Sequence, residues 1–117
     1  MAVKRIVTNI ATERVDDAVA FYRDILGLQV VMDLGWIVTL AGDEPATPQV
    51  SVASEGGSGT PVPDLSIEVD DLAQVHQRVL AAGLRVEYGP VTEPWGVRRF
   101  YVRDPCGLLV NILAHCP

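Results

Sequence analysis

The stretch LSIEVDDLAQVHQRVLAAG, residues 65–83, contains the pattern from which the fold can be predicted. Its first part, Leu65–Val69, is a run typical of a short β-strand. From Leu72 the apolar positions change to helical spacing, and Gly83 lies where such a helix would end. We therefore predict a strand followed by a helix. The apolar face of this helix consists of Leu72, Val75, His76, Val79 and Leu80.

The same pattern occurs earlier in the chain. Val3–Ala11 is a strand-like run, and apolar residues recur at helical spacing from Val15 until Gly27. Aligning Ile10 with Ile67 gives an offset of 57 residues, which falls to 56 between Gly27 and Gly83. Three short strands are predicted after each helix, at Gln29–Met32, Trp36–Leu40 and Gln49–Ala53, and at Arg85–Tyr88, Arg98–Arg103 and Leu108–Leu113. The chain is therefore a repeat that is weak in identity and clear in pattern.

This order predicts an α+β fold made of two βαβββ modules. We expect one domain, residues 1–117, with module 1 at about 3–53 and module 2 at about 64–115. Residues 54–63 are rich in Gly, Ser and Pro and are predicted to be a linker. Since each module is too small to bury its own sheet, we expect curved mixed sheets that pack together around a cleft, within one chain or exchanged across a homodimer. A small-molecule ligand is expected in such a cleft.

The charge of the chain excludes some classes of partner. Nine Lys and Arg against 15 Asp and Glu give a formal charge of −6, and no Lys or Arg occurs between Arg23 and Arg78. Nucleic acid requires a basic surface and is not expected, whereas a neutral or cationic ligand is. The sequence has no targeting segment and no apolar run of ~18 residues, so no membrane partner is expected. Cys106 and Cys116 lack metal-site spacing and are interpreted as free thiols of a cytoplasmic protein.

Three motifs resemble one known family. They are AFYRDILGL at residues 20–28, the helix entry VDDL at 69–72, and WGVRRFYVRDPCGLLVN at 95–111. With the repeat, they are similar to the glyoxalase/bleomycin-resistance/extradiol-dioxygenase superfamily, also called vicinal oxygen chelate. The resemblance covers nearly the whole chain, but it specifies the fold far better than the activity, because one fold hosts many functions.

The resemblance also implies where metal-dependent members would hold their ion. Those ligand positions match Val7, with Asn9 two residues on, then Asp64, and then Asn111. Valine cannot ligate, Asn is a weak ligand, and one carboxylate falls short of the three protein ligands of a typical catalytic site. We therefore predict no resident metal ion and no other cofactor.

Alternation along the last strand places Asn111 and His115 on one face, and the resemblance points Arg99 and Tyr101 inward from the strand before it. Arg99 is either a donor to a ligand or part of a surface salt bridge. His115 either shares the cleft with Asn111 or is exposed near the C-terminus.

Other candidates also have two interpretations. Trp36 and Trp95 either stack against a ligand in the cleft or are core residues. Asp64 is either a turn residue or a carboxylate in the cleft, where it would pair with a ligand ammonium or with Arg99. His76 is interpreted as a packed histidine of the second helix. The predicted ligand-binding set is Asn9, Trp36, Asp64, Trp95, Arg99, Tyr101, Asn111 and His115.

The vacant ligand positions favour a homodimeric, metal-free protein that resembles bleomycin-resistance proteins and sequesters an antibiotic-like, neutral or cationic molecule without catalysis. One alternative is a metal-dependent enzyme of glyoxalase, lyase or dioxygenase type, with a site relocated around Asp64 and His115. Another is a protein-interaction module with a vestigial cleft.

Overall fold

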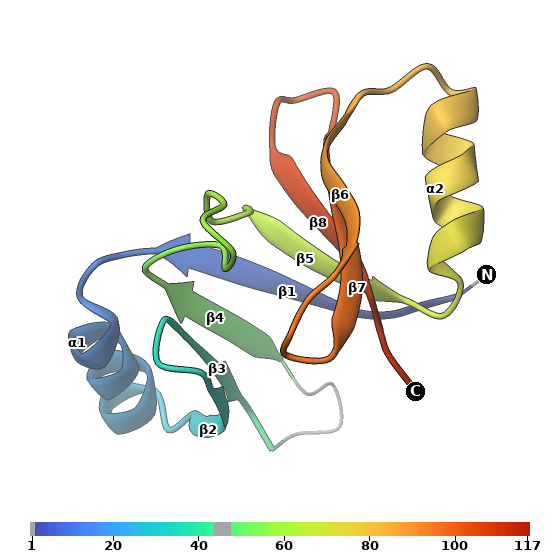
Figure 1. The fold of residues 1–117 in the computed structure, drawn as a ribbon. Coiled ribbons are helices and arrows are strands. Elements are labelled where there is room, and N and C mark those ends of the chain that lie inside the picture. Colours follow the sequence, from blue (N-terminus) through green and yellow to red (C-terminus); the bar gives the residue numbers. More distant parts are fainter. Residues whose placement is uncertain (1, 44–47) are drawn as a thin grey trace. The chain divides into compact units, whose positions relative to one another are not determined.

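The computed structural model describes residues 2–43 and 48–117, so most of the connection between the strands predicted at Trp36–Leu40 and Gln49–Ala53 lies outside the described residues. The chain divides into two compact units. Figure 1 labels the strands and helices from which they are built. The first unit is Val7–Val62, and the second is Pro63–Pro117 together with residues 2–6. The α+β class and the repeated order of strand, helix and three strands are confirmed.

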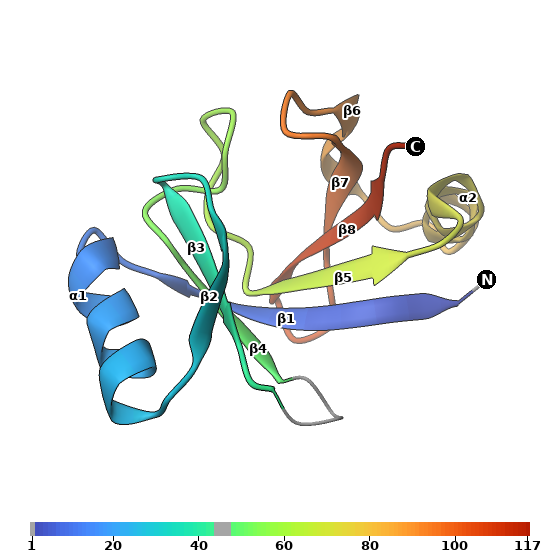
Figure 2. The same ribbon diagram turned by 90° about the horizontal axis from the view of Figure 1, so that it is seen from below.

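The first unit is a four-stranded mixed sheet with one helix. The strands lie in the order β2-β3-β4-β1, with β1 parallel to β4 and the other neighbours antiparallel. Helix α1 packs on one side of this sheet (Figure 2), and their core contains Val15, Val38, Leu40 and Val52. The elements are β1 (Val3–Ala11), α1 (Val15–Ala20), the π-helical turn η1 (Phe21–Ile25), β2 (Gln29–Asp33), β3 (Ile37–Ala41) and β4 (Gln49–Ala53).

The second unit repeats this arrangement. Its strands lie in the order β5-β8-β7-β6, with β5 parallel to β8 and the other neighbours antiparallel. Helix α2 packs against Phe100, Val102, Val110 and Ile112. The elements are β5 (Leu65–Val69), α2 (Leu72–Ala81), β6 (Val86–Thr92), β7 (Val97–Arg103) and β8 (Leu109–His115).

Helix α2 begins with a side-chain cap, because the Asp71 carboxylate accepts a hydrogen bond from the backbone N–H of Gln74 at 3.0 Å. We expect Asp71→Ala to lower the free energy of unfolding by about 1 kcal/mol, since one N–H at the helix start loses its acceptor. Urea unfolding would measure the loss. Asp71→Ser restores a capping oxygen and serves as the control, and an equal loss in both variants would contradict the capping role.

Two boundaries differ from the prediction. The first helix changes to π-helical geometry at Phe21 before it ends at Gly27, which has the expected positive φ of 73°. The strand predicted at Arg85–Tyr88 is too short, because β6 begins at Val86 and continues to Thr92. Strand β6 lies at an edge, where Pro90 is tolerated, and its pairing with β7 is irregular around Gly89 and Pro90.

The segment predicted as a linker contains a closed turn. Gly56 N–H donates to the Thr60 carbonyl at 2.8 Å, and Thr60 N–H donates to the Gly57 carbonyl at 3.0 Å. Gly57, Ser58 and Gly59 all have positive φ, which explains the glycines in this stretch. No helix in the described part of the chain is long and apolar enough to cross a membrane.

Candidate functional site

The candidate site lies on the sheet face of the second unit opposite α2. Because Phe100, Val102, Val110 and Ile112 pack toward α2, alternation turns the residues between them the other way. The predicted sharing of one face by Arg99 and Tyr101 is thereby confirmed. This face, called the face opposite α2 below, carries Ser66, Glu68, Arg99, Tyr101, Asn111 and Leu113.

Arg99 is held in a buried ion pair. Its Nη2 lies 2.6 Å from Glu93 Oε2 and its Nε donates to the same oxygen at 2.7 Å, with only 4% and 3% of the two side chains exposed. Tyr88 Oη donates to this Glu93 oxygen at 3.0 Å, and Arg99 Nη1 donates to Tyr101 Oη at 2.9 Å. The surface salt bridge that was one alternative for Arg99 is therefore wrong, and so is its pairing with Asp64.

Three aromatic rings surround the same guanidinium. The Arg99 Cζ lies 5.0 Å from the ring centroids of Trp95 and Tyr101, and 5.3 Å from that of Tyr88. Such contacts stabilise a cation in addition to its carboxylate partner. Since Glu93 neutralises Arg99, this part of the face does not attract anions strongly.

Glu93 and Tyr88 were missed by the sequence reasoning. Both belong to the hairpin that joins β6 to β7, where Tyr88 pairs with Tyr101 and Glu93 begins the turn that Gly96 closes. Extending β6 across Pro90 in the sequence would have placed Tyr88 opposite Tyr101. The partner of Arg99 could then have been sought in the turn.

The amide of Asn111 lies beside this cluster and has an unsatisfied end. Asn111 lies in β8, where it pairs with Tyr101 of β7 on one side and with Ser66 of β5 on the other. Its Nδ2 donates to Ser66 Oγ at 3.1 Å, while Oδ1 is buried and has no hydrogen-bond partner among the described residues. Turning the amide over would only exchange the two ends, so one polar group would still lack a partner. A buried group of this kind costs about 1–3 kcal/mol unless something else supplies the partner.

A second polar cluster lies farther along β5 and β8. His115 Nδ1 lies 2.8 Å from Glu68 Oε2, and Arg5 Nε lies 3.2 Å from Glu68 Oε1. More than half of the His115 side chain is exposed, as one of its two interpretations expected, yet it is held by Glu68. This cluster joins the start of β1 to β5 and β8.

Asp64 is used at the opposite end of β8. Its N–H donates to the Leu109 carbonyl and its Oδ2 accepts from the Leu109 N–H, both at 2.8 Å. His115 is six residues beyond Leu109, which is about 20 Å along a strand. A metal site built on both Asp64 and His115 is therefore wrong, because the Asp64 carboxylate joins the start of β5 to the start of β8.

In the first unit, Asn9 belongs to a polar row. It pairs with Ser51, which pairs with Thr39 on the next strand, and the Ser51 and Thr39 hydroxyls are 2.7 Å apart. This row corresponds in the repeat to Ser66, Asn111 and Tyr101. Trp36 is half-buried just before β3, and its carbonyl accepts the Ser54 N–H at 2.9 Å.

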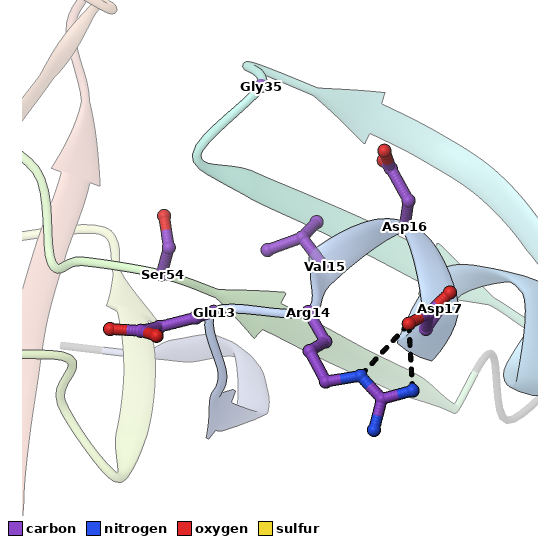
Figure 3. Close-up of a pocket in the computed structure, with 7 residues that line it drawn as sticks. All are labelled: Glu13, Arg14, Val15, Asp16, Asp17, Gly35 and Ser54. Carbon is purple, nitrogen blue, oxygen red and sulfur yellow. Dashed lines mark hydrogen bonds and ion pairs between the residues drawn. The ribbon is translucent and has the colours of Figure 1, made fainter.

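A surface depression of about 500 Å³ lies at the start of α1 (Figure 3). Its charged residues are exposed, and Arg14 is paired with Asp17 at 2.9 Å. Exposed charges interact weakly with ligands because solvent and salt screen them, so this depression is a weaker candidate than the face opposite α2. It is lined by Glu13, Arg14, Val15, Asp16, Asp17, Gly35 and Ser54.

The residues do not fit a three-ligand catalytic metal site. Of the positions implied by the family, Val7 is apolar and the Asp64 carboxylate accepts from Leu109. Within residues 2–43 and 48–117, no three His, Cys, Asp or Glu side chains cluster as metal ligands. The thiols of Cys106 and Cys116 are free and exposed.

Solved structures share this fold at low identity. The NAD-dependent benzaldehyde dehydrogenase of Legionella pneumophila has a TM-score of 0.76 and 13% identity, over 95% of this chain and 99% of that one. A Streptomyces coelicolor methylmalonyl-CoA epimerase, in complex with 2-nitronate-propionyl-CoA, has a TM-score of 0.74 and 18% identity, over 99% and 100%. A Vibrio splendidus member of the glyoxalase/bleomycin resistance protein/dioxygenase superfamily has a TM-score of 0.67 and 20% identity, over 97% of this chain and 99% of that one.

At these identities the likeness shows the fold alone. The comparison with curated proteins finds no match. The model of one protein family, however, matches residues 4–112, which is nearly the whole chain and includes both repeats. The chain therefore belongs to the Glyoxalase/Bleomycin resistance protein/Dioxygenase superfamily.

Proposed function

We propose that this protein binds a small neutral or cationic molecule at the face opposite α2 and sequesters it without a resident metal ion and without catalysis. The observation that carries the proposal is the buried Asn111 amide, whose Oδ1 has no hydrogen-bond partner among the described residues. A ligand N–H or O–H would satisfy this acceptor and recover the cost of burying it.

The surroundings of Asn111 favour that ligand class. Tyr101 is its neighbour on β7, and the Arg99 charge beyond it is neutralised by Glu93. A formal charge of −6 likewise disfavours anions and favours cations. Because Asn111 is 93% buried, neighbouring side chains must move for a ligand to reach it. An antibiotic-like compound with an amide, amine or hydroxyl donor meets these requirements.

Replacing Asn111 by Leu tests the proposal. We expect the free energy of unfolding of Asn111→Leu to equal or exceed that of the wild type, because the unsatisfied acceptor is removed. We also expect this variant to lose ligand binding. A thermal-shift screen of small molecules against the wild type, with chelator and then with divalent ions, would first identify binders. A saturating binder is expected to raise Tm by roughly 4 °C or more in the wild type and not in the variant.

Gln77→Leu removes an exposed amide from α2 and serves as the matched control. It should leave both Tm and the ligand shift unchanged. A strong destabilisation by Asn111→Leu would instead assign Asn111 a structural role. A ligand shift that survives in Asn111→Leu would contradict the site.

An enzyme is the second candidate, because methylmalonyl-CoA epimerases are among the proteins with this fold, and from the sequence we expect such an enzyme to depend on a metal ion. Elemental analysis of protein purified without chelator distinguishes the sequestration proposal from the enzyme. The sequestration proposal expects no stoichiometric Fe, Ni, Mn or Zn. One tightly held ion per chain would contradict it, and would favour the enzyme if adding that ion also produced activity.

A further inference from the structure

The two units carry corresponding rows of paired residues across their sheets. Both rows contain an Asn paired with a Ser on parallel strands, but the two residue types are exchanged between the units. The repeat, which is weak in identity, thus keeps a polar pair at the same register in both copies. The row of the second unit is Ser66, Asn111, Tyr101 and Tyr88. The row of the first unit is Asn9, Ser51, Thr39 and Met32.

The first row lies on the sheet face that points away from α1. Val38 and Val52 belong to the core beneath α1, so alternation turns Thr39 and Ser51 to the other face. Their hydroxyl oxygens are 2.7 Å apart, and we call them the hydroxyl pair.

The hydroxyl pair carries one more hydrogen than it uses. One hydroxyl donates to the other, and neither makes a further side-chain hydrogen bond with the part of the chain that the structure describes. Since each hydroxyl has one hydrogen to donate, one O–H remains without an acceptor. Only 4% of Thr39 and 3% of Ser51 is exposed, so this donor is also largely shielded from solvent. A buried donor without an acceptor is unfavourable, as is the acceptor of Asn111.

The neighbours of the hydroxyl pair are small or adaptable. Ala41 and Ala53 lie two residues farther along the same two strands, on the same face, and both are buried. They surround the O–H with apolar atoms and supply no acceptor from their side chains. Met32 follows Thr39 in the row, on the edge strand β2, and remains 38% exposed. Because methionine is flexible, the solvent-exposed end of the row can adapt to a small molecule.

The charge of the first unit limits which acceptor can approach. Residues 7–62 contain two Lys or Arg and eight Asp or Glu, so the whole formal charge of −6 lies in this unit. A carboxylate or phosphate is therefore repelled, whereas a simple cation offers no acceptor to an O–H. The remaining class is a neutral acceptor, such as the carbonyl oxygen of an amide, ester or ketone.

We propose that the hydroxyl pair of Thr39 and Ser51 is a second small-molecule site, which donates its remaining O–H to the carbonyl oxygen of a neutral ligand. Its chemistry is the reverse of that at Asn111, because Asn111 Oδ1 accepts and the hydroxyl pair donates. The inference goes beyond the function proposed above and does not depend on ligand binding at Asn111.

N,N-dimethylacetamide is the probe that tests this site, because its carbonyl accepts a hydrogen bond and it has no N–H or O–H to offer Asn111. In a titration followed by NMR, we expect saturable shifts of the Thr39 methyl resonance and of the backbone amide resonance of Ser51. The Kd should be on the order of millimolar, as is usual for so small a ligand. Nuclear Overhauser effects between the probe and the Thr39 methyl group should place the probe at the hydroxyl pair.

The double variant Thr39→Val/Ser51→Ala removes both hydroxyls with little change in shape. Either single variant would leave one O–H able to donate, so both residues must be replaced. We expect the Tm of the double variant to equal or exceed that of the wild type, and its Kd for the probe to rise by roughly 10-fold or more. Thr8→Val removes an exposed hydroxyl from β1 and is the matched control, which should bind the probe as the wild type does.

Three results would overturn the proposal. They are a wild type without saturable shifts, a double variant with unchanged Kd, and a control that loses the probe equally. If the double variant does not fold, the wild type decides alone, because missing Overhauser effects at Thr39 would also overturn the site. Since the probe has no donor, none of these results concerns the site at Asn111.

Discussion

Replacing Glu93 by Met is expected to lower the free energy of unfolding by about 3–5 kcal/mol, because the buried Arg99 guanidinium then loses the Glu93 carboxylate. Methionine has a length similar to glutamate, so the loss reports the charge and not a large cavity. A domain of this size has a total stability of about 5–15 kcal/mol, so this single change removes a large fraction of it. Guanidinium-induced unfolding followed by circular dichroism measures the effect.

The double variant Glu93→Met/Arg99→Met provides the control. Since neither charge is then buried, the free energy of unfolding should return to within about 1–2 kcal/mol of the wild type. If Glu93→Met alone costs less than about 1 kcal/mol, Arg99 reaches solvent or another partner in solution and the pair is not the buried ion pair described above.

The second large effect is expected at Phe100, whose side chain is completely buried beneath α2. Phe100→Ala removes a ring whose centroid lies 5.3 Å from the centroid of the His76 ring, and it leaves a cavity in the core of the second unit. We expect the free energy of unfolding to fall by about 3–5 kcal/mol. The measurement is the same denaturant titration used for Glu93.

Leu108→Ala is the comparison for Phe100, because Leu108 is 42% exposed and should change stability by no more than about 0.5 kcal/mol. Equal losses in both variants would contradict the description of the core. A packed His76 also predicts that its ring NMR resonances shift in Phe100→Ala and not in Leu108→Ala.

The elements that could be predicted are those whose signal is local. Gly27 and Gly83 end the two helices because each supplies the positive φ that other residues avoid. The face shared by Arg99 and Tyr101 follows from the two-residue period of a strand. Strand β6 could not be predicted beyond Tyr88, because Gly89 and Pro90 signal a turn unless it is known that the strand lies at an edge.

The site was harder to predict because its contacts depend on register. Asn111 was identified from the family resemblance, but its pairing with Ser66 depends on how β5 aligns with β8. Arg99 was singled out without its partner, because Glu93 lies in a turn whose geometry is set by the β6–β7 pairing. Asp64 and His115 are both plausible ligands in the sequence, and only the strand direction places them at opposite ends of β8.

The placement of the two tryptophans has a consequence for optical spectroscopy. Trp36 lies in the first unit and Trp95 in the second, so each unit carries its own fluorophore. The Arg99 guanidinium over the Trp95 ring places a cation against the excited indole, and loss of that contact changes the emission of Trp95. A Trp36→Phe form thus gives an emission signal for the Arg99 cluster alone, and comparing it with a Trp95→Phe form shows whether the two units melt together or one before the other.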